Sequence, residues 1–170
     1  MLPRARIKSF AATPGPLHSR VAADSSSPIA VPHDPLDTAR DVLRETFGHT
    51  AFRGLQAGVI GEILRGRSAL AVLPTGGGKS LCYQIPSLVR PGLGLVVSPL
   101  IALMADQVSA LQLSGVAAEK LDSNTGLDAR GDIWRRIDER TLELLYLSPE
   151  GLMQSSMLER LSRLPLALRR

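Results

Sequence analysis

From residue 34 onward, hydrophobic residues recur at the spacing of a helix face. In residues 34–48 they fall every three or four positions, which is the spacing of one helix face. These apolar residues are Leu36, Ala39, Leu43 and Phe47. Asp34 suits the N-cap of this helix, Pro35 its first turn and Gly48 its end. Residues 54–66 show the same spacing, so the pattern predicts two helices before the first strand.

Four short apolar runs follow, and they alternate with stretches that suit helices. The runs cover residues 69–73, 93–98, 115–121 and 142–148. A continuous apolar run between turn residues is typical of a parallel strand that is buried on both faces. The stretches predicted to be helical cover residues 79–89, 100–115, 127–140 and 149–164. This alternation predicts an α/β fold in which helices flank a parallel sheet.

Residues 1–34 lack a hydrophobic period. They are rich in proline, serine and alanine, a composition that predicts a disordered tail ahead of an ordered domain at 35–170. No acidic residue precedes Asp24, while Arg4, Arg6, Lys8 and Arg20 are basic, as in organellar targeting peptides. Because the prolines would break a long amphipathic helix, we expect a cytoplasmic protein, and organellar targeting stays open as the alternative.

Length, charge and cysteine count limit the kinds of partner that the protein can have. A length of 170 residues suits one domain, and a hydrophobic share of 44% supports a core. The net charge of +4 permits a polyanionic partner. A single cysteine, Cys82, excludes an internal disulfide and favours a reducing compartment. No apolar run is long enough to cross a bilayer, so neither a membrane nor a disulfide partner is expected.

The stretch LPTGGGKS at residues 73–80 carries the strongest chemical signal. Backbone N–H groups at a helix N-terminus attract phosphate, and Gly76, Gly77 and Gly78 permit close backbone approach. Lys79 would place its ammonium on the terminal phosphates, and the Ser80 hydroxyl would coordinate Mg²⁺. The stretch follows a predicted strand and opens a predicted helix, which favours a nucleotide site over an ordinary glycine-rich turn.

Leu73 departs from the usual phosphate-loop pattern, G-x-x-x-x-G-K-[ST], which has glycine at that position. Leu73, Pro74 and Thr75 must therefore form the turn in another way, with Pro74 fixing φ. The departure argues against phosphate-loop families that depend on this glycine, such as small nucleoside kinases.

Two further strand-to-helix junctions read Ser-Pro, at Ser98–Pro99 and at Ser148–Pro149. In each, serine can be the N-cap and proline the first helical residue, and helix capping alone would explain either pair. Ligands of open α/β sheets collect at the carboxyl ends of the strands, where the glycine-rich loop also falls. This edge is therefore a candidate surface for a polynucleotide backbone, whose phosphates require no base code.

Four segments in this order and spacing resemble the first RecA-like domain of RecQ-type DNA helicases, which belong to superfamily 2. The segments are TFGHTAFRGLQ, LPTGGGKSLCYQIP, VVSPLIALMADQV and LLYLSPEGLM. The resemblance spans residues 36–168, and the pairing of FR..Q with GGGKSLCYQIP is its most specific part. It implies an ATP-dependent 3'-5' DNA helicase and ATPase acting in recombination and repair, associated with the nucleoid if bacterial. The implied cofactors are ATP and Mg²⁺, and the implied partner is single-stranded or partly duplex DNA.

The resemblance also implies a role for each matching residue. Gln56 would read adenine, Arg53 would support the same site, and His49 lies where the family has an aromatic residue. The implied nucleotide-binding residues are Arg53, Gln56, Thr75, Gly76, Gly77, Gly78, Lys79 and Ser80. Lys79 and Ser80 are the implied catalytic residues, with Ser80 as the Mg²⁺ ligand. The implied DNA contacts are Ser98, Pro99 and Leu100 together with Ser148, Pro149 and Glu150.

The sequence departs from the family at its C-terminal end. RecQ-type helicases continue with Asp-Glu-Ala-His after the next strand and then with a second RecA-like domain, neither of which this sequence contains. The run LPLAL at residues 164–168 is interpreted as the opening of that strand. The sequence therefore predicts a truncated RecA-like domain at 35–170, which is incomplete at its C-terminus, has unpaired sheet edges, and binds nucleotide but hydrolyses it poorly. A stand-alone nucleotide- or DNA-binding module and a non-functional remnant remain as alternatives.

Overall fold

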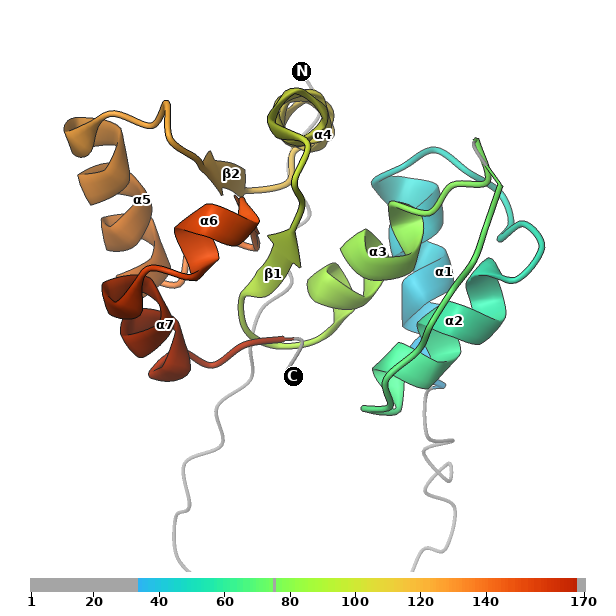
Figure 1. The fold of residues 1–170 in the computed structure, drawn as a ribbon. Helices are drawn as coiled ribbons and strands as arrows, with labels where there is room; N and C mark the ends of the chain where they lie inside the picture. The colour runs from blue at the N-terminus through green and yellow to red at the C-terminus, as the bar shows by residue number, and fades with distance from the viewer. Residues whose placement is uncertain (1–33, 75, 168–170) are drawn as a thin grey trace, which may run out of the picture. The chain divides into compact units, whose positions relative to one another are not determined.

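The computed structural model describes residues 34–74 and 76–167, and Figure 1 shows the order of their elements. The predicted tail lies outside the described residues except for Asp34, and Thr75 of the glycine-rich loop lies outside them as well. Within the described ranges, no helix is long and apolar enough to span a bilayer.

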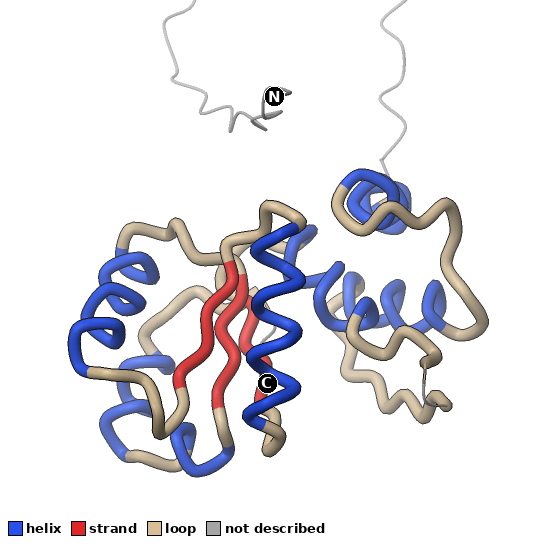
Figure 2. The backbone as a smooth tube through the Cα atoms, turned by 90° about the horizontal axis from the view of Figure 1, so that it is seen from above, coloured by secondary structure: helices blue, strands red, loops and turns tan. Residues whose placement is uncertain are grey.

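The strands of the described residues form a parallel sheet. β1 (Gly94–Val97), β2 (Ala118–Leu121) and β3 (Leu144–Leu147) lie in the order β1-β3-β2, with Val97, Leu147 and Leu121 in register at their carboxyl ends. Every residue of β3 is fully buried. Figure 2 shows why, since helices lie on both sides of the sheet. The predicted α/β fold with a parallel sheet flanked by helices is confirmed.

Each face of this sheet packs against its own apolar cluster, because alternate residues of a strand point to opposite sides. Leu145 and Leu147 of β3 pack in a cluster with residues of α5 and α7, including Ile133 and Leu161. On the other face, Tyr146 packs in a cluster with Met104 and Val108 of α4. The central strand is thus enclosed mainly by aliphatic side chains.

The helices match the predicted ones in order and in approximate length. They are α1 (Pro35–Glu45), α2 (Gln56–Leu64), α3 (Leu81–Val89), α4 (Ile101–Leu113), α5 (Leu127–Asp138), α6 (Pro149–Leu152) and α7 (Ser155–Ser162). At the start of α1, the Asp34 carboxylate accepts a hydrogen bond from the Leu36 N–H at 3.0 Å, which confirms the predicted N-cap. The single helix predicted for residues 149–164 is wrong, because α6 ends at Leu152 and α7 begins separately.

The strand predicted at residues 69–73 is also wrong. This segment has no regular structure, and its Leu70 and Val72 are 95% and 85% exposed. The backbone N–H and C=O groups of a strand must pair with those of a neighbouring strand. None of the described strands pairs with residues 69–73. An apolar run alone is therefore not sufficient to predict a strand, since the described sheet contains no partner that pairs with this segment.

Among the described residues, the edge of β1 that faces away from β3 has a backbone partner at its start. Leu93 forms a parallel bridge with Leu166, in which the Leu93 N–H donates to the Pro165 oxygen and the Ala167 N–H donates to the Leu93 oxygen, both at 3.0 Å. This pairing agrees with the interpretation of residues 164–168 as the opening of a strand. Beyond it, a cavity of about 530 Å³ lies between Leu95 and Val97 of β1 and residues 66–69.

Candidate functional site: the glycine-rich loop and the adjoining strand ends

Residues 73, 74 and 76–80 belong to the glycine-rich loop, which leads directly into α3. Gly76 and Gly78 have φ of 78° and 66°, a left-handed conformation that favours glycine. The Gly77 N–H donates to the Pro74 oxygen at 3.0 Å, and a Cβ on Gly77 would lie 2.9 Å from that oxygen. Pro74 thus closes the turn in a loop that has Leu73 in place of the usual first glycine.

The Lys79 side chain folds back over this loop. Its Nζ donates to the Leu73 oxygen at 3.0 Å and to the Pro74 oxygen at 2.9 Å, and the residue is exposed to solvent. An ammonium that donates to neutral carbonyl oxygens forms stronger hydrogen bonds when an anion replaces them. Lys79 is therefore positioned to transfer its hydrogen bonds from the loop to a bound phosphate.

Ser80 connects the loop to the next helix. Its hydroxyl accepts a hydrogen bond from Gln107 Nε2 of α4 at 3.4 Å, and Gln107 Oε1 in turn accepts from the Tyr83 hydroxyl at 2.8 Å. Sequence reasoning missed Gln107, since a polar residue within a helical stretch carries no signal of a partner 27 positions away. The contact joins the loop to α4, the helix that follows the Ser98–Pro99 junction.

Gln56 lies beneath the loop at the start of α2 and is only 2% exposed. Its Nε2 donates to the oxygens of Gly77 at 3.2 Å and Gly78 at 3.1 Å, while its Oε1 accepts from the Arg53 N–H at 2.8 Å. The structure thus brings Gln56 and the backbone of Arg53 to the glycine-rich loop. A small cavity of about 120 Å³ adjoins them, lined by His49, Ala51, Arg53, Gln56, Gly76, Gly78 and Leu81.

The two Ser-Pro junctions stand side by side at the carboxyl ends of β1 and β3, since the Ser98 N–H donates to the Leu147 oxygen at 3.0 Å. Ser148 is the N-cap of α6, and its hydroxyl accepts from the Gly151 N–H at 3.1 Å, as predicted. The capping role predicted for Ser98 is wrong. Its hydroxyl accepts from the Leu100 N–H at 3.3 Å, and α4 starts only at Ile101 because Leu100 has extended backbone angles.

Of the remaining residues implied as DNA contacts, Pro99, Leu100 and Glu150 are exposed, whereas Pro149 is half-buried. Leu100 is the N-cap of α4, and Glu150 lies in the first turn of α6. The structure therefore brings both junctions to one edge of the sheet, where Pro99, Leu100 and Glu150 face solvent.

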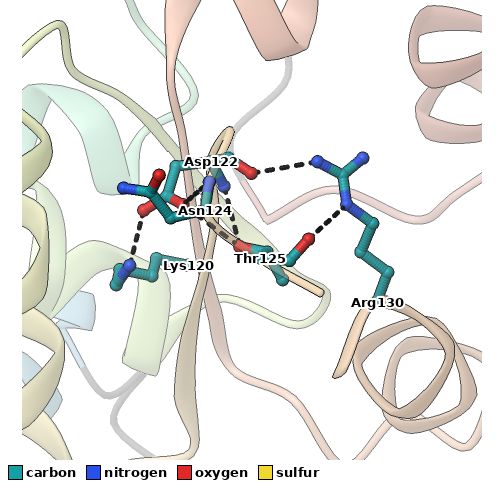
Figure 3. A network of polar contacts seen from close by, with 5 residues as sticks. All are labelled: Lys120, Asp122, Asn124, Thr125 and Arg130. Atoms are coloured by element: carbon teal, nitrogen blue, oxygen red, sulfur yellow. Dashed lines mark hydrogen bonds and ion pairs between the residues drawn. The ribbon is translucent and has the colours of Figure 1, made fainter. Parts of the chain in front are cut away.

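A polar network follows β2 at the same edge, as Figure 3 shows. The Asp122 side chain is fully buried and pairs with Lys120 Nζ at 2.5 Å, and its Oδ1 accepts from the Asn124 N–H at 2.8 Å. Arg130 fixes the loop from α5, donating to the backbone oxygens of Asp122 at 2.9 Å and Thr125 at 3.0 Å. Sequence reasoning missed this network, although the Asp-Ser-Asn-Thr cluster after an apolar run is a turn signal.

The charge on Asp122 depends on this network. Burial raises the pKa of its carboxyl, but the Lys120 ammonium and the hydrogen bonds from the Asn124 N–H and the Thr125 hydroxyl together hold the pKa below its usual value. The carboxylate therefore stays ionised. It serves to order the loop at residues 122–125, which follows β2 beside the end of β3.

Two buried titratable side chains lie outside the loop, one on α3 and one on β3. Cys82 is a small buried residue of α3, and burial raises the pKa of its thiol. Burial also raises the pKa of the Tyr146 phenol, whose oxygen accepts from Gln84 Nε2 at 3.0 Å. Among the residues that the structure describes, no three His, Cys, Asp or Glu side chains converge on a metal site.

A parallel α/β sheet whose strand ends adjoin a Gly-Gly-Gly-Lys-Ser loop defines the class of the protein, which is a partial RecA-like domain. Residues 53–167 match the family model described as DEAD/DEAH box helicase. The chain therefore belongs to the DEAD/DEAH box helicase family.

Within that family, the similar proteins are RecQ-type helicases. The chain is 46% identical over 125 residues to the ATP-dependent DNA helicase RecQ of Haemophilus influenzae, an alignment that covers 74% of this chain and 20% of that protein. It is 42% identical over 145 residues to the RecQ of Pasteurella multocida, covering 85% and 23%. It is 34% identical over 151 residues to ATP-dependent DNA helicase Q-like 2 of Arabidopsis thaliana, covering 88% and 21%. The predicted RecQ resemblance is confirmed, and the chain spans less than a quarter of the length of these relatives.

Proposed function

We propose that this chain is the ATP-binding part of an ATP-dependent DNA helicase of RecQ type. The relatives are named as ATP-dependent DNA helicases, which suggests the reaction. The loop at residues 73–80 offers the groups that would bind the phosphates of ATP. The observation that carries the proposal is the Lys79 ammonium, which is exposed and held by two neutral oxygens at the start of a helix. Such a group favours the phosphates of a nucleotide.

ATP would lie with its phosphates against Gly76, Gly77, Gly78, Lys79 and Ser80, and with its base toward Arg53 and Gln56. Thr75 is part of the proposed site through its place in the loop sequence. For Mg²⁺, Ser80 offers one hydroxyl oxygen, which fits a metal that takes its remaining ligands from phosphates and water. When bound, the Mg²⁺ would neutralise part of the phosphate charge.

We expect this chain to turn over ATP poorly. Hydrolysis requires a group that positions the attacking water and cations that stabilise the transition state. In the described ranges, no cluster of acidic residues or histidines accompanies the Ser80 hydroxyl. The residues of the loop would thus bind and orient the phosphates, and we expect them to be insufficient for turnover by themselves.

Single-stranded DNA would cross the edge formed by the two Ser-Pro junctions. Ser98, Pro99, Leu100, Ser148, Pro149 and Glu150 are the proposed contacts. The Ser98 and Ser148 hydroxyls are already engaged as acceptors, but each retains an O–H that can donate to a phosphate oxygen. The Glu150 carboxylate would repel phosphate, so its contribution would come through its backbone N–H.

Isothermal titration calorimetry with ATP and Mg²⁺ tests the proposal. The unaltered chain should bind ATP, and Lys79→Ala should weaken binding by about tenfold or more, which corresponds to about 1.4 kcal/mol. Arg135→Ala is the charge-matched control, since Arg135 is an exposed residue of α5 that pairs with Asp132. Equal affinities in the unaltered chain and Lys79→Ala would refute the proposed site.

A phosphate-release assay with single-stranded DNA tests the expectation of poor turnover. The unaltered chain should release no more phosphate with DNA than without it. DNA-stimulated release that disappears in Lys79→Ala would show instead that the chain is a competent ATPase.

A further inference from the structure

Gln107 of α4 reaches the glycine-rich loop from a different helix and contacts it at the hydroxyl of Ser80. We propose that Gln107 is a positioning residue for Ser80, which holds the hydroxyl so that the remaining side of its oxygen faces the Mg²⁺ of a bound nucleotide. The proposal rests on the nucleotide site proposed above and adds to it a residue outside the loop.

The Ser80 hydroxyl is not used to cap its own helix. Ser80 occupies the N-cap position of α3, but its φ of −59° and ψ of −40° are helical, whereas an N-cap residue usually has extended backbone angles. Within the described ranges, its side chain accepts no hydrogen bond from the first turn of α3. The helix itself therefore does not fix the direction of this hydroxyl, and the contact that does so comes from Gln107 Nε2 at 3.4 Å.

The amide of Gln107 is itself held in one orientation. Its Oε1 accepts from the Tyr83 hydroxyl at 2.8 Å, and because the oxygen and nitrogen of an amide point in different directions, Nε2 is left to donate to Ser80. Ser80 and Tyr83 are three positions apart, so they lie on the same face of the first turn of α3. All three residues are half-buried, which limits competition from water. Gln107 thus bridges two side chains at the start of α3.

This contact determines which part of the Ser80 oxygen remains available. A hydroxyl has two lone pairs and one hydrogen, and Gln107 occupies one of the lone pairs. The second lone pair can coordinate a metal ion, and the O–H can donate to a phosphate oxygen. Because Mg²⁺ requires near-octahedral geometry, a hydroxyl ligand held by a hydrogen bond from behind binds it better than one that rotates freely. Gln107 therefore makes the contacts expected of a residue that orients a metal ligand.

The effect of removing this amide should depend on the metal ion. Gln107→Met keeps the length of the side chain and removes the donor to Ser80. Because one hydrogen bond between neutral groups is lost, this variant should bind Mg²⁺-ATP about three- to tenfold more weakly. Its affinity for metal-free ATP, measured in EDTA, should change by less than about twofold, because the lost contact is with the proposed metal ligand.

Titration calorimetry of the chain with Mg²⁺-ATP and with metal-free ATP is the experiment, and Gln112→Met is the matched control. Gln112 also lies on α4 and also donates its amide, but to the Ala118 oxygen of β2 at 2.9 Å, so this variant should leave both affinities unchanged. An equal loss with and without metal in Gln107→Met, or no loss in either condition, would overturn the proposal. If the unaltered chain binds ATP in neither condition, the proposed function itself is refuted.

The side-chain amide resonance of Gln107 provides a readout that a purely structural role would not change. This resonance is assigned by its absence from the spectrum of Gln107→Met, in which unchanged backbone resonances of α5 report an intact fold. In the unaltered chain, Mg²⁺-ATP should shift the Gln107 resonance more than metal-free ATP does. Equal shifts with the two ligands would overturn the proposal.

Discussion

Replacing Asp122 by alanine should destabilise the domain more than any other single removal of a negative charge in the described residues. The Asp122 side chain is fully buried, whereas the other acidic residues with described ion pairs retain exposure of 27% or more. Alanine removes the ion pair with Lys120 and the acceptor of the Asn124 N–H together. Asp106→Ala is the matched control, because Asp106 is exposed on α4.

The magnitude follows from the two lost contacts. A hydrogen bond to a charged group contributes about 1.5–3 kcal/mol, and the Asn124 N–H provides one such bond. The ion pair adds up to about 1 kcal/mol, because Lys120 is still 30% exposed and solvent screens the pair. We therefore expect Asp122→Ala to lower the free energy of unfolding by about 2–4 kcal/mol and Asp106→Ala to change it by less than about 0.5 kcal/mol.

Urea denaturation followed by circular dichroism measures both values, and its pH dependence adds a second check. The pKa of Asp122 is lower in the folded chain than in the unfolded one, so its contribution is complete above the unfolded pKa of about 4 and disappears as the pH falls through the folded pKa. The difference between the unaltered chain and Asp122→Ala should thus shrink in acid. A difference below about 0.5 kcal/mol at neutral pH would refute the structural role of this network.

Three further substitutions test other parts of the structure by the same denaturation assay. Tyr146→Phe should cost about 1–3 kcal/mol, because Gln84 Nε2 is left buried without its acceptor; a neutral result would contradict that contact. Ser148→Ala should lower the free energy of unfolding by about 1 kcal/mol, because the N-cap hydrogen bond from the Gly151 N–H is lost. Ser98→Ala should lower it by less, because Ser98 is not the N-cap of a helix. Leu70→Ser should change the free energy of unfolding by less than about 0.5 kcal/mol, since Leu70 is almost fully exposed; a loss above about 2 kcal/mol would indicate that residues 69–73 form a buried strand after all.

The sequence predicted correctly those elements whose contacts come from residues nearby in the chain. The apolar runs that became β1, β2 and β3 pack against neighbouring helices, so their hydrophobic residues predicted strands correctly. Burial on both faces holds along the whole of β3, whereas Val97 of β1 is 45% exposed and β2 carries the partly exposed Glu119 and Lys120. The Asp34 and Ser148 caps were predictable for the same reason, since each bonds an N–H two or three residues further on.

The features that sequence reasoning missed depend on distant partners. Residues 69–73 have the composition of a buried strand, but no described strand lies beside them. Ser98 has the same Ser-Pro signal as Ser148, yet the extended backbone of Leu100 delays the helix. The contacts of Gln107 with Ser80 and of Gln56 with Gly78 join segments more than twenty positions apart, which no local pattern reveals.

Paramagnetic broadening by Mn²⁺-ATP is the most direct test of the central claim, that residues 73–80 bind the phosphates of a nucleotide. Mn²⁺ substitutes for Mg²⁺ on the phosphates and broadens the amide resonances of the residues nearest to it. The account predicts selective broadening at Gly76, Gly77, Gly78, Lys79 and Ser80, which unlabelled Mg²⁺-ATP in excess reverses. Broadening centred on another part of the chain, or none at concentrations that occupy known ATP sites, would contradict it.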